Sequence, residues 1–326
     1  MSRAAKLPAG QPAPLVERLL RGEPAALSRA ITRVENDEPG AAELLAAIQP
    51  HLGKATVLGI TGPPGVGKST LIDALVSELR QRGRKIGVLA VDPSSPLSGG
   101  AILGDRIRMA RHVGDPGVFV RSLAARGHLG GLFRTAWGVI QVMDAAGPDF
   151  IIVETVGTGQ SEVEITDYTD ANVVVCAPGL GDDVQAIKAG ILEIADILVV
   201  NKSDQPNAEN TVQQLEGMLG LRPAAKAHAR IVSTTASNGE GLSQLADLVE
   251  AIAAERSAGQ GHARAARRVS RVRRVVANAA GDLVRGLALR SDAQDIDRLC
   301  ERFARGEITL EAAALQLVQL LATDRT

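Results

Sequence analysis

A glycine loop in the first quarter of the chain constrains its fold more than any other feature. The loop follows the apolar run 55–61 and precedes the amphipathic stretch 70–79, so a strand, a loop and a helix are predicted in that order. It matches the pattern G-x-x-x-x-G-K-[ST]. Backbone N–H groups and a helix N-terminus can surround a di- or triphosphate in this setting, so the sequence predicts a nucleotide site rather than a chance turn. The residues expected to contact the nucleotide are Gly62, Pro63, Pro64, Gly65, Val66, Gly67, Lys68, Ser69 and Thr70.

Two side chains of this loop have predicted chemical roles. Lys68 is expected to reach the β- and γ-phosphates, where its charge would assist phosphoryl transfer. The Ser69 hydroxyl is expected to bind Mg²⁺. We therefore predict Mg²⁺ as a cofactor.

The base is indicated by a second motif, which follows the apolar run 197–200. Asn201, Lys202 and Asp204 form the N-K-x-D arrangement of GTPases. A carboxylate at Asp204 can accept hydrogen bonds from N1–H and the 2-amino group of guanine, whereas adenine offers neither donor. Lys202 is expected to lay its stem along the base, and Asn201 to brace the loop. The predicted ligands are therefore GTP and GDP.

A further contact to guanine is predicted in the segment 233–237. The Ala236 N–H is expected to donate to the base oxygen, with Thr235 beside it. This prediction rests on the order of the motifs along the chain, because loops rich in Ser and Thr are common.

Alternating strands and helices predict an α/β fold with a mainly parallel sheet, as in a P-loop NTPase with a SIMIBI-type G domain. Helical spacing before and after this region predicts two extensions. We expect an N-terminal helical extension over 1–52, a GTPase domain over 53–255 and a C-terminal helical segment over 256–326. The expected strands are 55–61, 85–91, 118–121, 150–154, 172–176, 197–200 and 230–233.

Composition excludes several other functions. The chain has 326 residues and a net charge of −1, which gives no general attraction to nucleic acid or to an anionic membrane. One Trp, one Tyr and four Phe leave few side chains to stack on bases, so no nucleic-acid partner is expected. No apolar run is long enough for a membrane span. Two cysteines cannot form a disulfide framework, and we expect a cytoplasmic location.

Three acidic residues lie where a magnesium site would need them. Asp92 and Glu154 each end a predicted strand, and Asp105 lies in a glycine-flanked loop. Mg²⁺ takes only one or two carboxylates in most sites, so some of the three would act through water. Asp105 has an alternative role as a helix N-cap. Gly157 follows Glu154 in a variant of the D-x-x-G pattern, and its N–H is expected to bind the γ-phosphate.

These motifs together resemble the MeaB/ArgK group of G proteins. The resemblance rests on the phosphate loop and on the segments 91–95, 154–162 and 178–190, and it covers nearly the whole chain. It implies a chaperone of adenosylcobalamin-dependent acyl-CoA mutases, above all methylmalonyl-CoA mutase. In that group GTP binding and hydrolysis gate cofactor loading and protect or rescue the mutase. The resemblance also implies a homodimer built through the C-terminal helices.

The segment after the strand 172–176 has two interpretations. Asp182, Asp183 and Lys188 lie between glycines, so different ion pairs could hold the loop in two arrangements. From its residues alone the segment is an ordinary solvated loop. The family resemblance favours an additional switch that contacts the mutase.

Hydrolysis is predicted to be slow without a partner. Many GTPases place a Gln directly after the switch glycine, whereas here Thr158 follows Gly157 and Gln160 comes later. Lys68, Mg²⁺ and the loop N–H groups are expected to supply most of the catalysis. Asp92, Asp105 and Glu154 are the other candidate catalytic residues, and their individual roles stay open.

The arginine-rich start of the C-terminal helical segment, 264–276, is predicted to form an amphipathic helix rather than a nucleic-acid tail. Its arginines alternate with valines, which gives one apolar face. We expect the following residues to form an apolar dimer seam: Val269, Val272, Val276, Leu283, Leu287 and Leu289.

Three rival functions remain. One is a kinase or ATPase linked to amino-acid transport, another is a nickel-type metallochaperone GTPase, and a third is a dimeric scaffold without nucleotide turnover. The five His residues show no metal-ligand spacing, which disfavours the nickel protein.

Overall fold

The structure is a computed structural model that describes residues 12–92, 109–124, 129–155, 168–179, 193–220, 229–258, 261–290 and 294–323. The chain divides into two compact units, Met1–Ala266 and Arg267–Thr326. Each unit is described by itself below.

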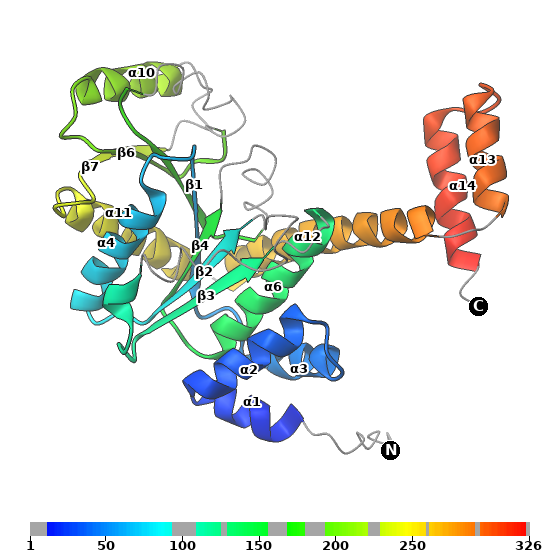
Figure 1. Cartoon of the computed structure of the whole chain (residues 1–326), viewed down its shortest axis with the longest axis horizontal. Coiled ribbons are helices and arrows are strands. Elements are labelled where there is room, and N and C mark those ends of the chain that lie inside the picture. Colours follow the sequence, from blue (N-terminus) through cyan, green and yellow to red (C-terminus); the bar gives the residue numbers. More distant parts are fainter. Residues whose placement is uncertain are drawn as a thin grey trace. The chain divides into compact units, whose positions relative to one another are not determined.

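The first unit is built on a seven-stranded parallel sheet (Figure 1). The strand order is β3-β2-β4-β1-β5-β6-β7, and every neighbouring pair is parallel. Each predicted strand is confirmed, with its ends shifted by a few residues. The strands are β1 (Thr56–Thr61), β2 (Ile86–Asp92), β3 (Val118–Ala124), β4 (Phe150–Thr155), β5 (Ala171–Cys176), β6 (Ile197–Asn201) and β7 (Arg230–Thr234).

The central strands are buried along their whole length. Every residue of β4, β5 and β6 is buried, and their sequences are mainly apolar runs rich in Val and Ile. Such runs are typical of parallel strands that are covered on both faces. The sequence pattern therefore places helices on both sides of the sheet.

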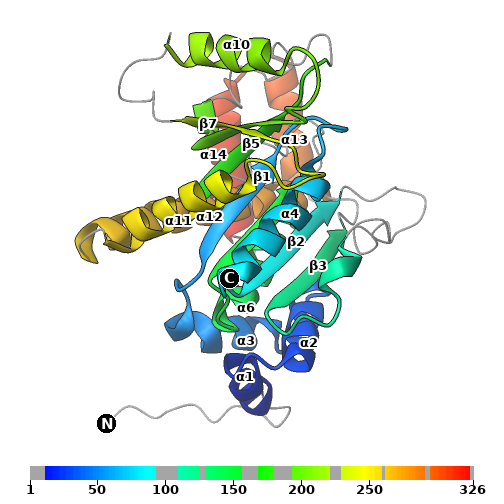
Figure 2. The same cartoon turned by 90° about the vertical axis from the view of Figure 1, so that its left-hand side faces the viewer.

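Helices cover the two faces as this pattern requires (Figures 1 and 2). On one face α4 (Lys68–Gln81) and α11 (Leu242–Ala258) pack on alternate strand residues such as Ile152 and Val173. On the other face α10 (Ala208–Gly220) packs on the intervening residues Val174 and Leu198. The helix α6 (Leu129–Ala145) lies over β2 and β4, where Met143 contacts Gly87.

Three short N-terminal helices pack beside α6 (Figure 2). They are α1 (Pro12–Leu20), α2 (Pro24–Glu35) and α3 (Ala41–Ile48). A Cβ on Gly138 of α6 would lie 2.7 Å from Val34 Cγ1, so glycine allows α2 to approach closely. Arg121 of β3 also pairs with Glu35. The N-terminal helices therefore belong to the same compact unit as the sheet.

The chain enters β1 through a carboxylate cap. Asp144 at the end of α6 accepts hydrogen bonds from the main-chain N–H groups of Gly53, Lys54 and Ala55. The bonds from Lys54 and Ala55 measure 3.1 and 2.9 Å. This cap satisfies backbone donors in the turn that leads into the central strand.

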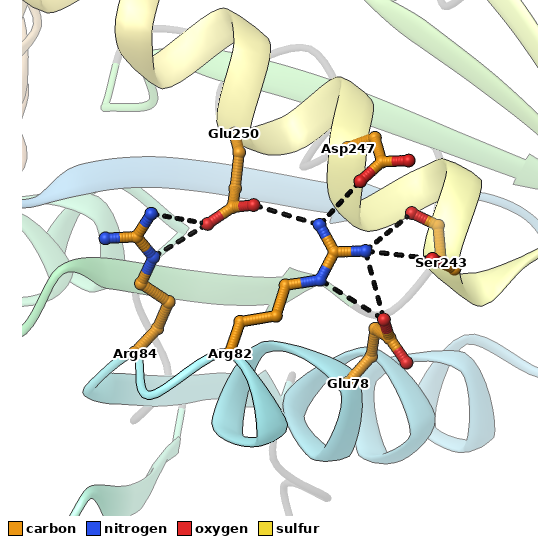
Figure 3. Close-up of polar contacts among 6 residues, drawn as sticks. All are labelled: Glu78, Arg82, Arg84, Ser243, Asp247 and Glu250. Carbon is orange, nitrogen blue, oxygen red and sulfur yellow. Dashed lines mark hydrogen bonds and ion pairs between the residues drawn. The ribbon is translucent and has the colours of Figure 1, made fainter.

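An arginine network joins the end of α4 to α11 (Figure 3). Arg82 donates to Asp247, Glu250, Glu78 and the Ser243 carbonyl over distances of 2.6 to 3.2 Å, and its side chain is 21% exposed. Hydrogen bonds to Asp247 and Glu250 raise the pKa of Arg82 above its ordinary value, against the opposing effect of burial. Arg82 therefore links two helices that follow different parts of the nucleotide site.

The second unit is helical, as predicted for the end of the chain. The helix α12 (Gly261–Arg290) crosses the boundary between the units, and α13 (Gln294–Ala304) packs against α14 (Leu310–Thr323). The predicted boundary at 255/256 falls inside α11, which continues to Ala258. Over the described residues we find no helix with the length and hydropathy of a membrane span.

Candidate nucleotide site

The glycine loop connects β1 to α4 at the carboxyl edge of the sheet. The strand ends at Thr61 and the helix begins at Lys68, as the sequence predicts. Gly62 must be glycine, because a Cβ there would lie 2.1 Å from the Val175 main-chain oxygen. Gly67 has a φ of 93°, and a Cβ there would lie 2.6 Å from Asn201 Nδ2. These two close approaches fix the loop between β5 and the end of β6.

Lys68 is buried within its own loop. Its Nζ donates to the main-chain oxygens of Gly62, at 2.7 Å, and Pro63, at 2.9 Å. Only 8% of the residue is exposed. The ammonium group therefore lies inside the curve of the loop, beside the N-terminus of α4, where the helix dipole also favours an anion.

Ser69 and Glu154 form the clearest pair of predicted metal ligands. The Ser69 Oγ donates to Glu154 Oε1 at 2.7 Å, and both residues are buried. The strand register places Glu154 opposite Ile60 of β1 and Ala90 of β2. A hydroxyl and a carboxylate oxygen at this spacing suit Mg²⁺, which prefers hard oxygen ligands. The donor set therefore fits the ion.

The other predicted metal and phosphate ligands are only partly described. Asp92 is the last residue of β2, next to the Val91–Thr155 pair, so its main chain lies at the same edge as Glu154. Its side chain lies outside the described part, as do Asp105 and Gly157. Within the described ranges, no cluster of three or more His, Cys, Asp or Glu residues could hold a metal ion.

The predicted switch residues cannot be placed. Asp182, Asp183 and Lys188 all lie outside the described residues, which end at Gly179 and resume at Glu193. The strand β5 that leads into this segment is fully buried. The role of these residues stays a prediction.

Asn201 binds the phosphate loop to the end of β6. Its Nδ2 donates to the Val66 main-chain oxygen at 2.8 Å, while its Oδ1 accepts from Thr234 Oγ1 and the Ala236 N–H, both at 3.2 Å. The residue is 2% exposed. Asn201 is part of the first predicted guanine segment and therefore joins the glycine loop to the second.

Lys202 makes a second link between the same loops. Its Nζ donates to the Gly65 main-chain oxygen at 2.9 Å, and its φ of 57° is unusual for a lysine. The side chain thus crosses over the phosphate loop. Asp204 lies two residues further on and is exposed to solvent. An exposed carboxylate beside a lysine stem is consistent with a surface that receives a planar base.

The third predicted guanine segment contacts Asn201. The Ala236 N–H, which is predicted to donate to the base oxygen, donates to Asn201 Oδ1 in this structure, and its contact to the base stays a prediction. Thr235 Oγ1 lies 2.9 Å from Ser203 Oγ, which binds the two guanine segments together. The contribution of Thr234 and Ser203 was not predicted. A hydroxyl within each motif was the signal in the sequence.

Comparison with known proteins agrees with this geometry. Residues 27–288 match the family model described as methylmalonyl Co-A mutase-associated GTPase MeaB. The chain is 50% identical over 246 residues to a putative GTPase from Pyrococcus abyssi, covering 72% of this chain and 74% of the relative. It is 44% identical over 199 residues to the GTPase ArgK of Escherichia coli, covering 60% of each protein.

A solved structure supports the fold over the whole chain. The crystal structure of a protein named LAO/AO transport system kinase aligns with a TM-score of 0.72 and 25% identity, covering 98% of this chain and 100% of the other. The match spans both the sheet and the terminal helices. With the phosphate loop and the N-K-x-D motif joined by Asn201, these likenesses lead to one conclusion: the chain belongs to the MeaB family of GTPases.

Proposed function

We propose that this protein hydrolyses GTP in a slow, Mg²⁺-dependent reaction and serves as a chaperone of adenosylcobalamin-dependent methylmalonyl-CoA mutase. It would gate cofactor loading and protect or reactivate the mutase. The family name supports the mutase as partner, and the guanine and phosphate motifs support GTP as the nucleotide. We also propose a cytoplasmic location.

The chain's own residues account for most of the proposed hydrolysis. Lys68 and the N–H groups at the start of α4 would hold the β- and γ-phosphates and stabilise the charge that develops on them. A water oxygen would bond to the γ-phosphorus as the bond to the β-γ bridging oxygen breaks, which yields GDP and phosphate. Ser69 and Glu154 would hold Mg²⁺, which neutralises phosphate charge when bound.

The single observation that carries the guanine assignment is the Asn201 amide. It donates to Val66 of the phosphate loop and accepts from Ala236, so one side chain fixes the distance between the phosphate and guanine segments. In a solvated turn that matched N-K-x-D by chance, this amide would be expected to face water instead of being buried against a phosphate loop. The geometry therefore supports a guanine nucleotide over other ligands.

The test of the chaperone role is complex formation that depends on the nucleotide. The purified chain should bind a cobalamin-dependent methylmalonyl-CoA mutase with different affinity in GDP and in a non-hydrolysable GTP analogue. By linkage, the mutase must then change nucleotide affinity by the same factor. Equal binding to the mutase in both nucleotide states, or none, would contradict the proposal.

The predicted switch residues give a sharper version of this test. Asp182→Ala and Lys188→Ala should leave intrinsic hydrolysis largely unchanged, because both lie outside the phosphate loop and the guanine motif. Both should reduce the mutase's acceleration of hydrolysis and the nucleotide control of cobalamin loading. If both variants keep full acceleration and normal loading, Asp182 and Lys188 are not switch residues.

A second function is suggested by the similar solved structure, because the protein it contains is named a transport system kinase. Analysis of the reaction products separates the two functions. GDP and free phosphate, with no phosphorylated acceptor, would favour the chaperone. A phosphorylated acceptor that forms in proportion to GDP would favour the kinase.

We also propose that the protein is a homodimer that pairs through its C-terminal helices. Three valines along α12, Val269, Val272 and Val276, are 59%, 40% and 60% exposed. Pairing with a second copy would remove this apolar row from water. Sedimentation should show a dimer that becomes monomeric in the Val269→Asp, Val276→Asp double variant. A wild-type monomer at micromolar concentration would refute the pairing.

A further inference from the structure

The connection between β2 and β3 packs along α4 and forms ion pairs with it. In its described part, Met109 is buried in the same core as residues of α4. Arg111 and His112 contact Asp73 of the helix, and Asp115 pairs with Arg80 further along it. Two separate ion-pair contacts therefore hold this connection on the helix that starts at the phosphate loop.

Asp73 is a buried carboxylate at the first of these contacts. Its side chain is 3% exposed, and its Oδ2 accepts from Arg111 Nη2. Nε2 of His112 lies 3.1 Å from Asp73 Oδ1 and 3.2 Å from the Asp73 main-chain oxygen. The hydrogen bond of this nitrogen runs to the main-chain oxygen, so Nε2 carries the proton, whereas Oδ1 has no hydrogen-bond partner among the described residues. The carboxylate thus pairs with an exposed guanidinium through Oδ2 and lies beside a buried imidazole.

Its place on the helix brings Asp73 close to Ser69, one of the predicted metal ligands. Ser69 precedes it by four residues, so the two side chains lie on the same face of α4. Ser69 donates to Glu154, and Ser77 donates to the Asp73 main-chain oxygen at 2.9 Å. Asp73 therefore stands one helical turn behind the hydroxyl that is predicted to bind Mg²⁺.

The second contact already holds the connection in place. Arg80 donates twice to Asp115, at 2.8 and 2.9 Å, and this pair is partly exposed. A Cβ on Gly117 would lie 2.2 Å from Arg80 Cζ, so the chain packs directly on this arginine. Burying a charge is costly, and a second pair with a fully buried carboxylate is not needed to attach the connection. The Asp73 contact lies nearer to the phosphate-loop end of α4 than the Arg80–Asp115 pair.

We propose that Asp73 is a positioning residue of the Mg²⁺ site. Through His112 and Arg111 it holds the connection against the first turns of α4, and so it fixes the direction in which Ser69 faces Glu154. Residues that orient metal ligands in this way affect metal affinity strongly. The inference rests on the proposed Mg²⁺-dependent hydrolysis.

The test compares two isosteric substitutions on the same two elements, Asp73→Asn and Asp115→Asn. Thermal unfolding of the GDP complex is measured as MgCl₂ is raised, and GTP hydrolysis is measured over the same range. Asp73→Asn should raise the half-saturating Mg²⁺ concentration about tenfold or more in both measurements. GDP affinity without Mg²⁺ should be unchanged. Asp115→Asn should lower the melting temperature and leave the Mg²⁺ dependence as in the wild type.

The outcomes separate this inference from the proposed function. A wild type with no Mg²⁺ effect on melting or hydrolysis would overturn both. If Mg²⁺ acts on the wild type as expected, but the half-saturating Mg²⁺ concentration changes equally in the two variants or in neither, only the role of Asp73 is overturned. If Asp73→Asn does not fold, Arg111→Gln replaces it and Arg80→Gln serves as its control. Arg111 is 72% exposed, so its removal leaves no cavity, and only Arg111→Gln should weaken Mg²⁺ binding.

Discussion

The hydroxyl of Ser69 donates to the carboxylate of Glu154 over 2.7 Å, although the two residues lie 85 positions apart in the chain. The contact joins the first turn of α4 to the end of β4. Both groups are buried, and an isolated buried carboxylate would be costly. The pair therefore marks the place where the phosphate loop meets the acidic edge of the sheet.

Removing the side chain of either Lys68 or Ser69 should stop GTP hydrolysis without unfolding the protein. Ser69→Ala loses the predicted metal ligand and Lys68→Ala loses the phosphate charge partner, so both should abolish GTP hydrolysis. Phosphate release and circular dichroism measure the two properties. Ser77→Ala is the matched control, because among the described residues its hydroxyl bonds to a carbonyl of the same helix. Normal hydrolysis by a folded Ser69→Ala variant would place the site elsewhere.

Changing the predicted guanine reader should change base preference. Asp204→Asn exchanges an acceptor for a donor, so GTP binding should weaken by about 2 kcal/mol or more, with a gain for xanthosine triphosphate. Competition among GTP, ATP and XTP measures this. Glu209→Gln removes a nearby exposed charge outside the motif and should leave the preference unchanged. Equal affinity of the wild type for ATP and GTP would contradict the assignment.

The arginine network at the end of α4 should contribute to stability rather than to catalysis (Figure 3). Arg82→Met keeps the aliphatic stem and loses all hydrogen bonds to α11, and it should lower the free energy of unfolding by about 1–2 kcal/mol. Arg84→Met, which loses the contact to Glu250, should cost less. Denaturant unfolding measures both variants. Equal effects would mean that the four-partner network adds nothing to a single ion pair.

The Arg80–Asp115 pair should make stability depend on acid pH. The hydrogen bond from Arg80 is the main cause that holds the pKa of Asp115 below its ordinary value of 3.8. A lowered pKa means that the stabilisation is complete above 3.8 and is lost as the pH falls through the lower folded value. The difference in stability between wild type and Asp115→Asn should therefore be constant near neutral pH and shrink below pH 3.8. A difference that stays constant through the acid range would contradict this.

The strands were predictable because each one is marked by a local sequence pattern. Each parallel strand is a short run of branched apolar residues, and the phosphate loop follows the first of them. The helix ends were less predictable: α11 continues through Glu255, because a helix can carry polar residues on its solvent face.

Within the site, the residue types were predictable and most partners were not. The sequence indicates that Asn201 braces a loop, but only the fold brings Val66 within 2.8 Å of it. The Asp73–His112 contact had no signal at all, since neither residue belongs to a motif and the strand order brings them together. Long-range hydrogen bonds of this kind depend on the packing of whole elements, which a local pattern does not encode.

The bond from Asn201 to Val66 has a consequence for biosynthesis. It spans 135 positions, so a ribosome that has just released the phosphate loop has not yet made the side chain that braces it. The central strand β1 likewise waits for β4 and β5, its two neighbours in the sheet. A nascent chain that ends before Ala236 lacks one of the hydrogen bonds that join the segments of the predicted nucleotide site. Because domains fold largely as units during translation, we expect nucleotide binding to begin only after most of the first compact unit has emerged.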